Sequence, residues 1–221
     1  MNDANLEPKV YFGQFGTYQI TDRDRWEVRI YRTGLLVAAL CFAVGTGIVF
    51  WQDKIPGAIE AVTPLYIVFC LALGVSLLTI HIYMAALHRL LQAFWLVGFA
   101  SAIDLILQSE QPFALAVYDY PNSLWGIGFT FAALTGIFFK EAFCFDRFET
   151  KFLTPLIPIL LLGHLTGWLP EDAKPVLLGT WAVLFFIFAA RKIPQSIPSD
   201  IGDKSVFEHL RQIRKNPASE T

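Results

Sequence analysis

The stretch GLLVAALCFAVGTGIVFWQ at residues 34–52 contains no charged side chain. An α-helix rises about 1.5 Å per residue, so this stretch is long enough to cross most of a hydrocarbon core about 30 Å thick. Five more apolar runs follow, at 64–88, 90–108, 124–145, 152–169 and 175–190. The chain is 55% hydrophobic and 16% charged, which leaves little polar surface for a water-soluble domain. The sequence therefore predicts an all-α polytopic membrane protein, a six-helix transmembrane bundle.

The basic residues predict the orientation of this bundle. Six spans place fifteen of the seventeen Lys and Arg residues on one side and only Lys54 and Lys174 on the other. Basic residues in short loops stay cytoplasmic, so we expect both termini in the cytoplasm. The fifteen are Lys9, Arg23, Arg25, Arg29, Arg32, Arg89, Lys140, Arg147, Lys151, Arg191, Lys192, Lys204, Arg211, Arg214 and Lys215.

Three regions follow from these runs: a cytoplasmic N-terminal segment at 1–33, a six-span domain at 34–192 and a cytoplasmic tail at 193–221. Residues 9–20 lack a helical period and predict a short extended or turn-rich element. Thr21 and Asp24 have the spacing of a capping box at the start of a helix. The tail predicts a short amphipathic helix with an apolar stripe and basic residues away from it. The stripe is Val206, Leu210 and Ile213, and the basic residues are Arg211, Arg214 and Lys215.

Ionisable residues in spans are costly, so they mark candidate functional sites. A first candidate cluster lies at the cytoplasmic ends of spans two and four and consists of His81, His88, Lys140, Glu141 and Cys144. On a continuous helix over 64–88, His81 and His88 share one face but stand roughly 10 Å apart, so they cannot ligate one metal together. One of them could join Glu141 or Cys144 around a metal, or exchange protons with Glu141. The structural alternative is a buried polar pair between helices, with basic side chains reaching the headgroups.

A second candidate is a deeper polar pair, Asp104 and His164. Span three runs outward from about residue 90 and span five from about residue 152. The rise of the helix then puts the two side chains at similar depths, about 20 Å and 18 Å above the cytoplasmic end. The pair is either part of a proton or ion relay or a satisfied polar contact between helices.

Other function classes lack support in the sequence. No HxxxH, CxxC or HExxH spacing occurs, and Cys41, Cys70 and Cys144 lie apart within or at the end of spans. These observations argue against a disulfide framework and a zinc cluster, and they name neither a metal nor a cofactor. The two three-span halves show no matched broken helices of the kind that transporters use at a midplane site. The basic face suits anionic lipid headgroups of the bilayer and gives no indication of nucleic acid.

Four stretches together resemble an uncharacterised integral membrane family of cyanobacteria and plastids. They are YFGQFG at 11–16, YRTGLL at 31–36, HIYMAALHRLLQ at 81–92 and FKEAFCF at 139–145. The likeness covers residues from about 10 to about 195. It implies a thylakoid or plasma membrane in a photosynthetic setting, and it implies no activity and no ligand residues.

Three hypotheses from different classes remain open. The first is an accessory or assembly factor that associates with a larger membrane complex. The second is a proton-coupled carrier or channel that uses Asp104, His164, Glu141 and His81. The third is an intramembrane enzyme or cofactor-binding protein that uses His81, His88, Glu141 and Cys144, although no nucleophile–base pair is visible in the sequence.

Overall fold

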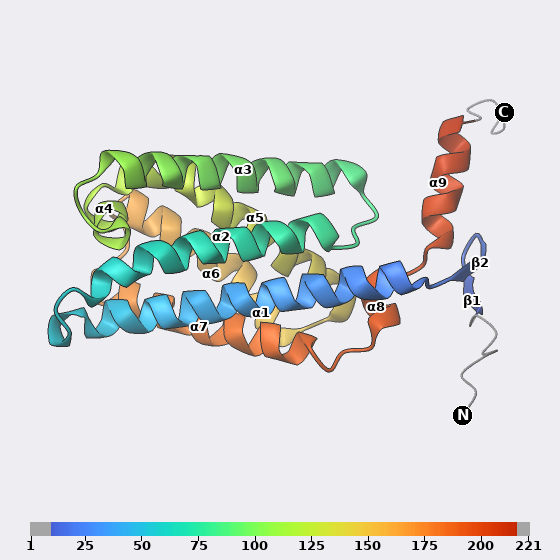
Figure 1. The fold of residues 1–221 in the computed structure, drawn as a ribbon, viewed down its shortest axis with the longest axis horizontal. Coiled ribbons are helices and arrows are strands. Elements are labelled where there is room, and N and C mark those ends of the chain that lie inside the picture. Colours follow the sequence, from blue (N-terminus) through green and yellow to red (C-terminus); the bar gives the residue numbers. More distant parts are fainter. Residues whose placement is uncertain (1–9, 216–221) are drawn as a thin grey trace.

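Six long helices run side by side in the computed structural model, which describes residues 10–215 (Figure 1). All six are long and apolar enough to cross a membrane. They confirm the predicted all-α bundle of six spans. The helices are α1 (Asp22–Trp51), α2 (Val62–Thr79), α3 (Ala85–Gln108), α5 (Leu124–Phe145), α6 (Phe148–Leu165) and α7 (Ala173–Lys192).

Shorter elements connect and flank the bundle. α4 (Phe113–Asp119) lies between α3 and α5, and α8 (Ile197–Ile201) and α9 (Ser205–Lys215) follow α7. Three 3₁₀ turns lie at Gln52–Lys54, Ala58–Ala61 and Pro121–Ser123. Strands β1 (Val10–Gly13) and β2 (Gly16–Gln19) pair in antiparallel register, Val10 with Gln19 and Gly13 with Gly16.

The long helices close into a ring. Each of α1, α2, α3, α5, α6 and α7 packs on the next in that order, and α7 packs on α1. The inside of the ring is filled by buried aliphatic side chains and large aromatic rings. Trp181 meets Phe131 edge to face at 5.1 Å, and Phe138 meets Phe185 in the same way at 5.3 Å. Such pairs add about 0.5–1.5 kcal/mol each to the burial of their area, so the middle of the bundle is a packed core.

Helices α3 and α5 pack closely against each other at Gly98. A Cβ atom on Gly98 would lie 2.2 Å from the backbone nitrogen of Thr130, so any larger residue would force α3 away from α5. Small residues commonly allow this kind of approach between membrane helices.

One predicted boundary is wrong. The second span was expected to run unbroken over 64–88, but α2 ends at Thr79 and α3 begins at Ala85. Ile80 is extended, with ψ at 137°, and Ile80 and Ile82 are buried. The connection is thus apolar because it packs against the bundle, and hydropathy does not distinguish such a turn from a helix. The turn carries His81 out of the helix in which it was placed.

The first helix begins earlier than its apolar run. The side chain of Asp24 accepts the backbone N–H of Thr21 at 2.7 Å, and the Thr21 hydroxyl accepts the backbone N–H of Asp24 at 3.3 Å. This capping box starts α1 at Asp22, twelve residues before the predicted span at 34.

The end of the bundle at which α1, α3 and α6 begin and α2, α5 and α7 end is called the charged end below. Beyond it lie the hairpin Val10–Gln19 and α9, with α9 running across the direction of the long helices (Figure 1). The hairpin is joined to the α9 region by the backbone N–H groups of Gln14 and Phe15, which donate to Asp203 at 2.6 Å and to Ser205 at 3.0 Å. The ring of Phe15 stacks on His209 at 4.0 Å. Lys9 and the side chains of Arg214 and Lys215 lie outside the described part of the chain.

Candidate functional site: buried charges at one end of the bundle

Buried charged side chains gather at one end of the molecule. Within residues 10–215, all of them lie at the charged end, and none lies in the middle of the bundle or at the opposite end. They come from α1, α5, α6, α7 and α8. They are Asp24, Arg32, Glu141, Glu149, Lys192 and Asp200.

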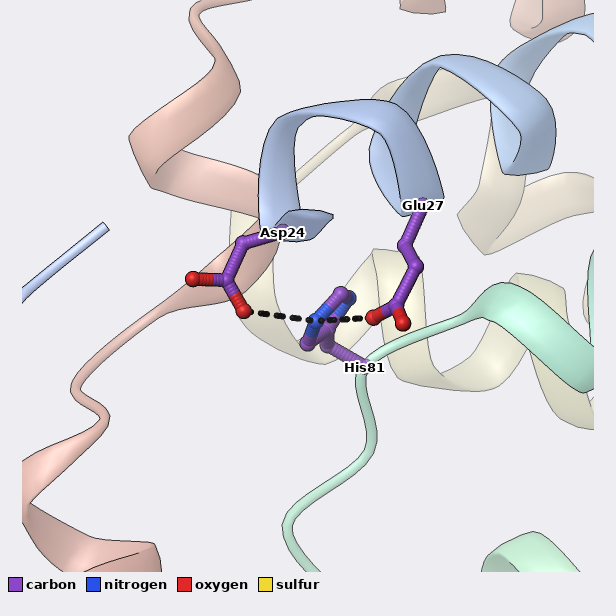
Figure 2. Close-up of side chains that lie close together, drawn as sticks. All are labelled: Asp24, Glu27 and His81. Atoms are coloured by element: carbon purple, nitrogen blue, oxygen red, sulfur yellow. Dashed lines mark ion pairs between the residues drawn. The ribbon is translucent and has the colours of Figure 1, made fainter. Parts of the chain in front are cut away.

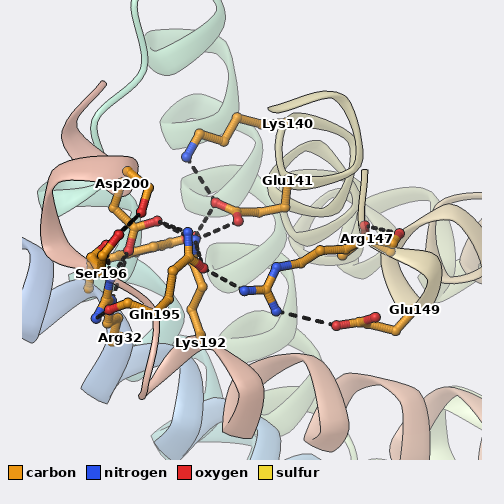
Figure 3. A network of polar contacts seen from close by, with 12 residues as sticks. Arg32, Lys140, Glu141, Arg147, Glu149, Lys192, Gln195, Ser196 and Asp200 are labelled. Carbon is orange, nitrogen blue, oxygen red and sulfur yellow. Dashed lines mark hydrogen bonds and ion pairs between the residues drawn. The ribbon is translucent and has the colours of Figure 1, made fainter. Parts of the chain in front are cut away.

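Glu141 of α5 is the centre of this group, and its side chain is fully buried (Figure 3). One carboxylate oxygen accepts from Lys192 of α7 at 2.6 Å. The other accepts from the neighbouring Lys140 at 2.9 Å and from the hydroxyl of Tyr31 on α1 at 3.1 Å. Lys192 also donates to Asp200 of α8. A single carboxylate therefore joins α1, α5 and α7, and Lys192 extends the connection to α8.

Arg32 makes the second connection to Asp200. Its guanidinium lies 2.6 Å from the Asp200 carboxylate and also donates to the carbonyls of Gln195 at 2.6 Å and Ser196 at 3.0 Å. These carbonyls follow the end of α7, where backbone acceptors lack helical partners. The planar fork of arginine suits this combination of carboxylate and carbonyls. Arg32 thereby fixes the segment between α7 and α8 against α1.

An outer branch ties α6 into the same network. Arg147 donates to the side chain of Gln195 at 2.6 Å and pairs with Glu149 at 3.4 Å. Glu149, whose side chain is almost fully buried, also accepts from Arg191 at 2.8 Å. The branch joins the start of α6 to the last turn of α7.

The charged groups of the network pair with one another. Its three carboxylates, those of Glu141, Glu149 and Asp200, are each held by two cations. Buried ion pairs cost desolvation energy, and their best use is to specify one arrangement. A carboxylate held by two cations is also a poor general base. The arrangement can lock α1, α5, α6, α7 and α8 together, and its described members present no free acid–base pair.

A second group of ionisable side chains lies at the same end and consists of Asp24, Glu27 and His81 (Figure 2). His81, in the α2–α3 connection, points its Nε2 between two carboxylates of the first turns of α1. The Nε2 atom is 3.4 Å from Glu27 and 4.0 Å from Asp24. Burial lowers the pKa of His81 below its ordinary value, against the opposing effect of the two carboxylates. These three side chains are the described His, Cys, Asp and Glu residues that could hold a metal ion together.

The structure separates the five residues of the first predicted cluster. Lys140 and Glu141 lie in the network, whereas His81 faces the carboxylates of α1 and Cys144 is exposed. His88 lies on α3 with its Nε2 2.6 Å from the carbonyl of Leu77. The predicted shared helix face of His81 and His88 is wrong because the helix breaks between them.

The predicted contact of Asp104 with His164 is also wrong. Asp104 is exposed and accepts from Gln108 of its own helix at 2.6 Å. His164 lies 3.2 Å from the carbonyl of Tyr118 and stacks on that residue's ring. Similar depth did not bring the two together because α5 lies between α3 and α6 in the ring.

The sequence analysis missed most members of the network, which are Tyr31, Arg32, Arg147, Glu149, Arg191, Lys192, Gln195 and Asp200. Arg32 and Lys192 were counted only as basic residues flanking spans, a role that exposed residues also fill. Asp200 lies in a linker rich in proline and serine, which carries no periodicity. The one usable signal was the position of Arg32 next to an apolar run at 34–52, and it does not name a partner.

Comparison with known proteins assigns the chain to a family. Residues 75–209 match the model of a family described as "Uncharacterized integral membrane protein (DUF2301)". No curated protein and no solved structure matches the chain. The matched region runs from the last turns of α2 into α9 and includes His81, Glu141, Lys192 and Asp200.

Proposed function

The chain belongs to this family of integral membrane proteins, and on that premise we propose that it is an accessory factor that docks on a larger membrane protein complex. The hairpin Val10–Gln19 and the helix Ser205–Lys215 together form the docking surface, which we call the platform. The following observations support a binding role over transport or catalysis.

The observation that carries the proposal is the exposed apolar surface of the platform. Phe12 is 89% exposed, and Val10, Phe15 and Leu210 are also exposed. The platform is nevertheless fixed to itself and to the bundle. Phe207 of α9 stacks on Tyr83 of the α2–α3 connection at 4.8 Å, and Lys204 pairs with Asp24 of α1 at 2.7 Å. Aromatic side chains held on a preorganised support are typical of binding surfaces.

The interior of the bundle argues against a carrier or channel. Ionisable side chains that line a membrane pathway are expected at several depths. In the described chain the buried charges stop at the charged end, and packed aromatic rings such as Phe131, Trp181 and Phe185 fill the middle. A proton or ion entering at Glu141 would meet this apolar core.

The closed network argues against an intramembrane enzyme at Glu141. Lys140 and Lys192 hold its carboxylate, and Tyr31 donates to it as well. A reacting group would have to displace these partners inside a buried site. The network instead serves docking by fixing the helix ends on which the platform stands.

Orientation and location complete the proposal. The basic residues of the charged end favour a cytoplasmic position for the platform, with both termini inside. The resemblance of stretches such as HIYMAALHRLLQ at 81–92 to a family of cyanobacteria and plastids favours a photosynthetic membrane, either thylakoid or plasma membrane.

The test is site-specific photo-crosslinking in the native membrane, followed by size fractionation in a mild detergent. A crosslinker in place of Phe12 on the platform is compared with one in place of Leu107, which is 80% exposed on the last turn of α3 at the opposite end. We expect a discrete crosslinked partner from position 12, absent from position 107, and migration of the unmodified protein with a large complex.

A Phe12→Ala variant should lose most of this comigration, whereas Leu107→Ala should keep it. Migration of the wild-type protein as a lone monomer or small oligomer would contradict the proposal. Equal comigration of the two alanine variants would place the docking surface elsewhere and contradict the role of the platform.

A further inference from the structure

The side chains of Asp24, Glu27 and His81 converge from two elements that are far apart in the sequence. Asp24 and Glu27 are three residues apart on α1, so they lie on one helix face, and His81 comes from the α2–α3 connection (Figure 2). Each residue offers one ligand atom, and these three atoms all lie within 4.8 Å of one another. From this convergence we propose that the three residues bind a divalent first-row transition-metal cation of the zinc type.

The spacing of the three atoms suits an ion better than direct contact. A tetrahedral zinc site with bonds of about 2.0–2.2 Å holds its ligand atoms roughly 3.4 Å apart. His81 Nε2 lies 3.4 Å from the Glu27 carboxylate and 4.0 Å from that of Asp24. Both distances exceed the usual N–H···O range of 2.7–3.2 Å. A small movement of the side chains would bring all three atoms to bonding distance from one ion.

Each carboxylate is already oriented by a donor on its other oxygen. Asp24 Oδ2 accepts from Thr21 and from Lys204, both at 2.7 Å. Glu27 Oε1 accepts from Arg23 at 2.8 Å. This leaves Asp24 Oδ1 and Glu27 Oε2 directed toward His81. Metal-binding carboxylates and imidazoles are commonly fixed by such outer contacts, which set their orientation before the ion arrives.

The two carboxylate oxygens that face His81 favour a cation between them. A neutral imidazole has one N–H and can satisfy at most one of the two carboxylate oxygens that it faces. A divalent cation would contact both of these oxygens at once and accept the lone pair of Nε2 from a neutral ring.

The donor set defines the class of cation. One imidazole nitrogen and two carboxylate oxygens suit zinc and its first-row neighbours, whereas magnesium prefers oxygen ligands and keeps much of its water. Three protein ligands leave at least one coordination position for water. The ion would tie the first turns of α1 to the α2–α3 connection at the base of the platform. This site does not depend on the docking proposal, since neither Phe12 nor any other exposed platform residue contributes a ligand.

The test is metal binding by the full-length protein, purified in detergent without an affinity tag and stripped with a chelator. Calorimetric titration with Zn²⁺ should give one ion per chain, and Co²⁺ should produce visible d–d absorption from a bound complex. Mg²⁺ at the same concentrations should bind far more weakly. We expect His81→Ala and Glu27→Gln each to weaken Zn²⁺ binding by at least about 10–100-fold, the loss that even outer-contact changes cause at metal sites.

The matched control is His88→Ala, because His88 also lies at the charged end but contacts the Leu77 carbonyl and no carboxylate. It should bind Zn²⁺ as the wild type does. Glu27→Gln keeps the shape of the side chain and provides the test if His81→Ala fails to fold. Failure of the wild type to bind one Zn²⁺ ion, or equal binding by the wild type and Glu27→Gln, would overturn the proposal.

Discussion

The two ends of the bundle use the same three residue types in opposite ways. At the charged end Glu141 accepts from two lysines and from the hydroxyl of Tyr31. At the opposite end Glu171 accepts from Lys174 and from the hydroxyl of Tyr118, both at 2.6 Å. The side chain of Glu141 is 0% exposed, whereas that of Glu171 is 69% exposed.

Burial changes how much the same contacts contribute to the stability of the fold. A carboxylate in water keeps its hydration if a partner is lost, so an exposed pair adds little to stability. A buried carboxylate has no such replacement, and its partners are left as uncompensated charges. The Glu141 group spans three helices that are far apart in sequence, while Glu171 and Lys174 are three residues apart. The contacts at the charged end therefore hold the helices in place, whereas those at the opposite end add little to the stability of the bundle.

Neutralising each glutamate in turn should give the largest difference in stability between the two ends. Glu141→Gln should lower the free energy of unfolding by about 3–5 kcal/mol, because Lys140 and Lys192 would share a buried site with one fewer negative charge. Glu171→Gln should cost only a small fraction of that. Unfolding of both variants in the same detergent, followed by circular dichroism against denaturant, measures the difference. Equal losses in the two variants would mean that burial does not distinguish the ends.

A second test exchanges the type of cation at each end. Arg32→Lys should lower the free energy of unfolding by about 2 kcal/mol, since a lysine cannot reach Asp200 and the carbonyls after α7 at once. The reverse exchange at the opposite end, Lys174→Arg, should have little effect because its partner Glu171 is solvated. Thermal unfolding of both variants in matched micelles provides the measurement. An Arg32→Lys variant as stable as the wild type would show that the guanidinium fork is dispensable.

The sequence predicted the scaffold of the molecule because hydropathy and length are local properties. Six apolar runs gave six helices, and the capping box of Thr21 and Asp24 is present at the start of α1. The break at residues 80–84 was missed because it contains no glycine or proline and its side chains other than His81 are apolar or aromatic. Local pattern also led to the wrong pairing of Asp104 with His164, since depth along a helix does not say which helices are neighbours.

The buried network could not be predicted for a related reason. Its contacts join residues separated by 51 positions between Glu141 and Lys192 and by 168 between Arg32 and Asp200. A single sequence shows which residues are charged but not which of them face one another in the ring. Lys140 and Glu141 were found because they lie inside a predicted span, where any charge is conspicuous. The meeting of His81 with Asp24 and Glu27 depends on a turn that hydropathy does not reveal.

The smallest expected effect is the pH dependence of stability that comes from the exposed Glu171. Hydrogen bonds from Lys174 and Tyr118 hold the pKa of Glu171 below its ordinary value of 4.5. A carboxyl group with a lowered pKa in the folded state adds stability above its unfolded pKa, and this contribution is lost as the pH falls through the folded pKa. The wild type should therefore be slightly more stable than Glu171→Gln at pH 6, and the difference should vanish at pH values below the folded pKa. Melting temperatures of the two proteins across this range measure it, and a difference that persists unchanged in acid would mean that Glu171 acts through packing instead of its charge.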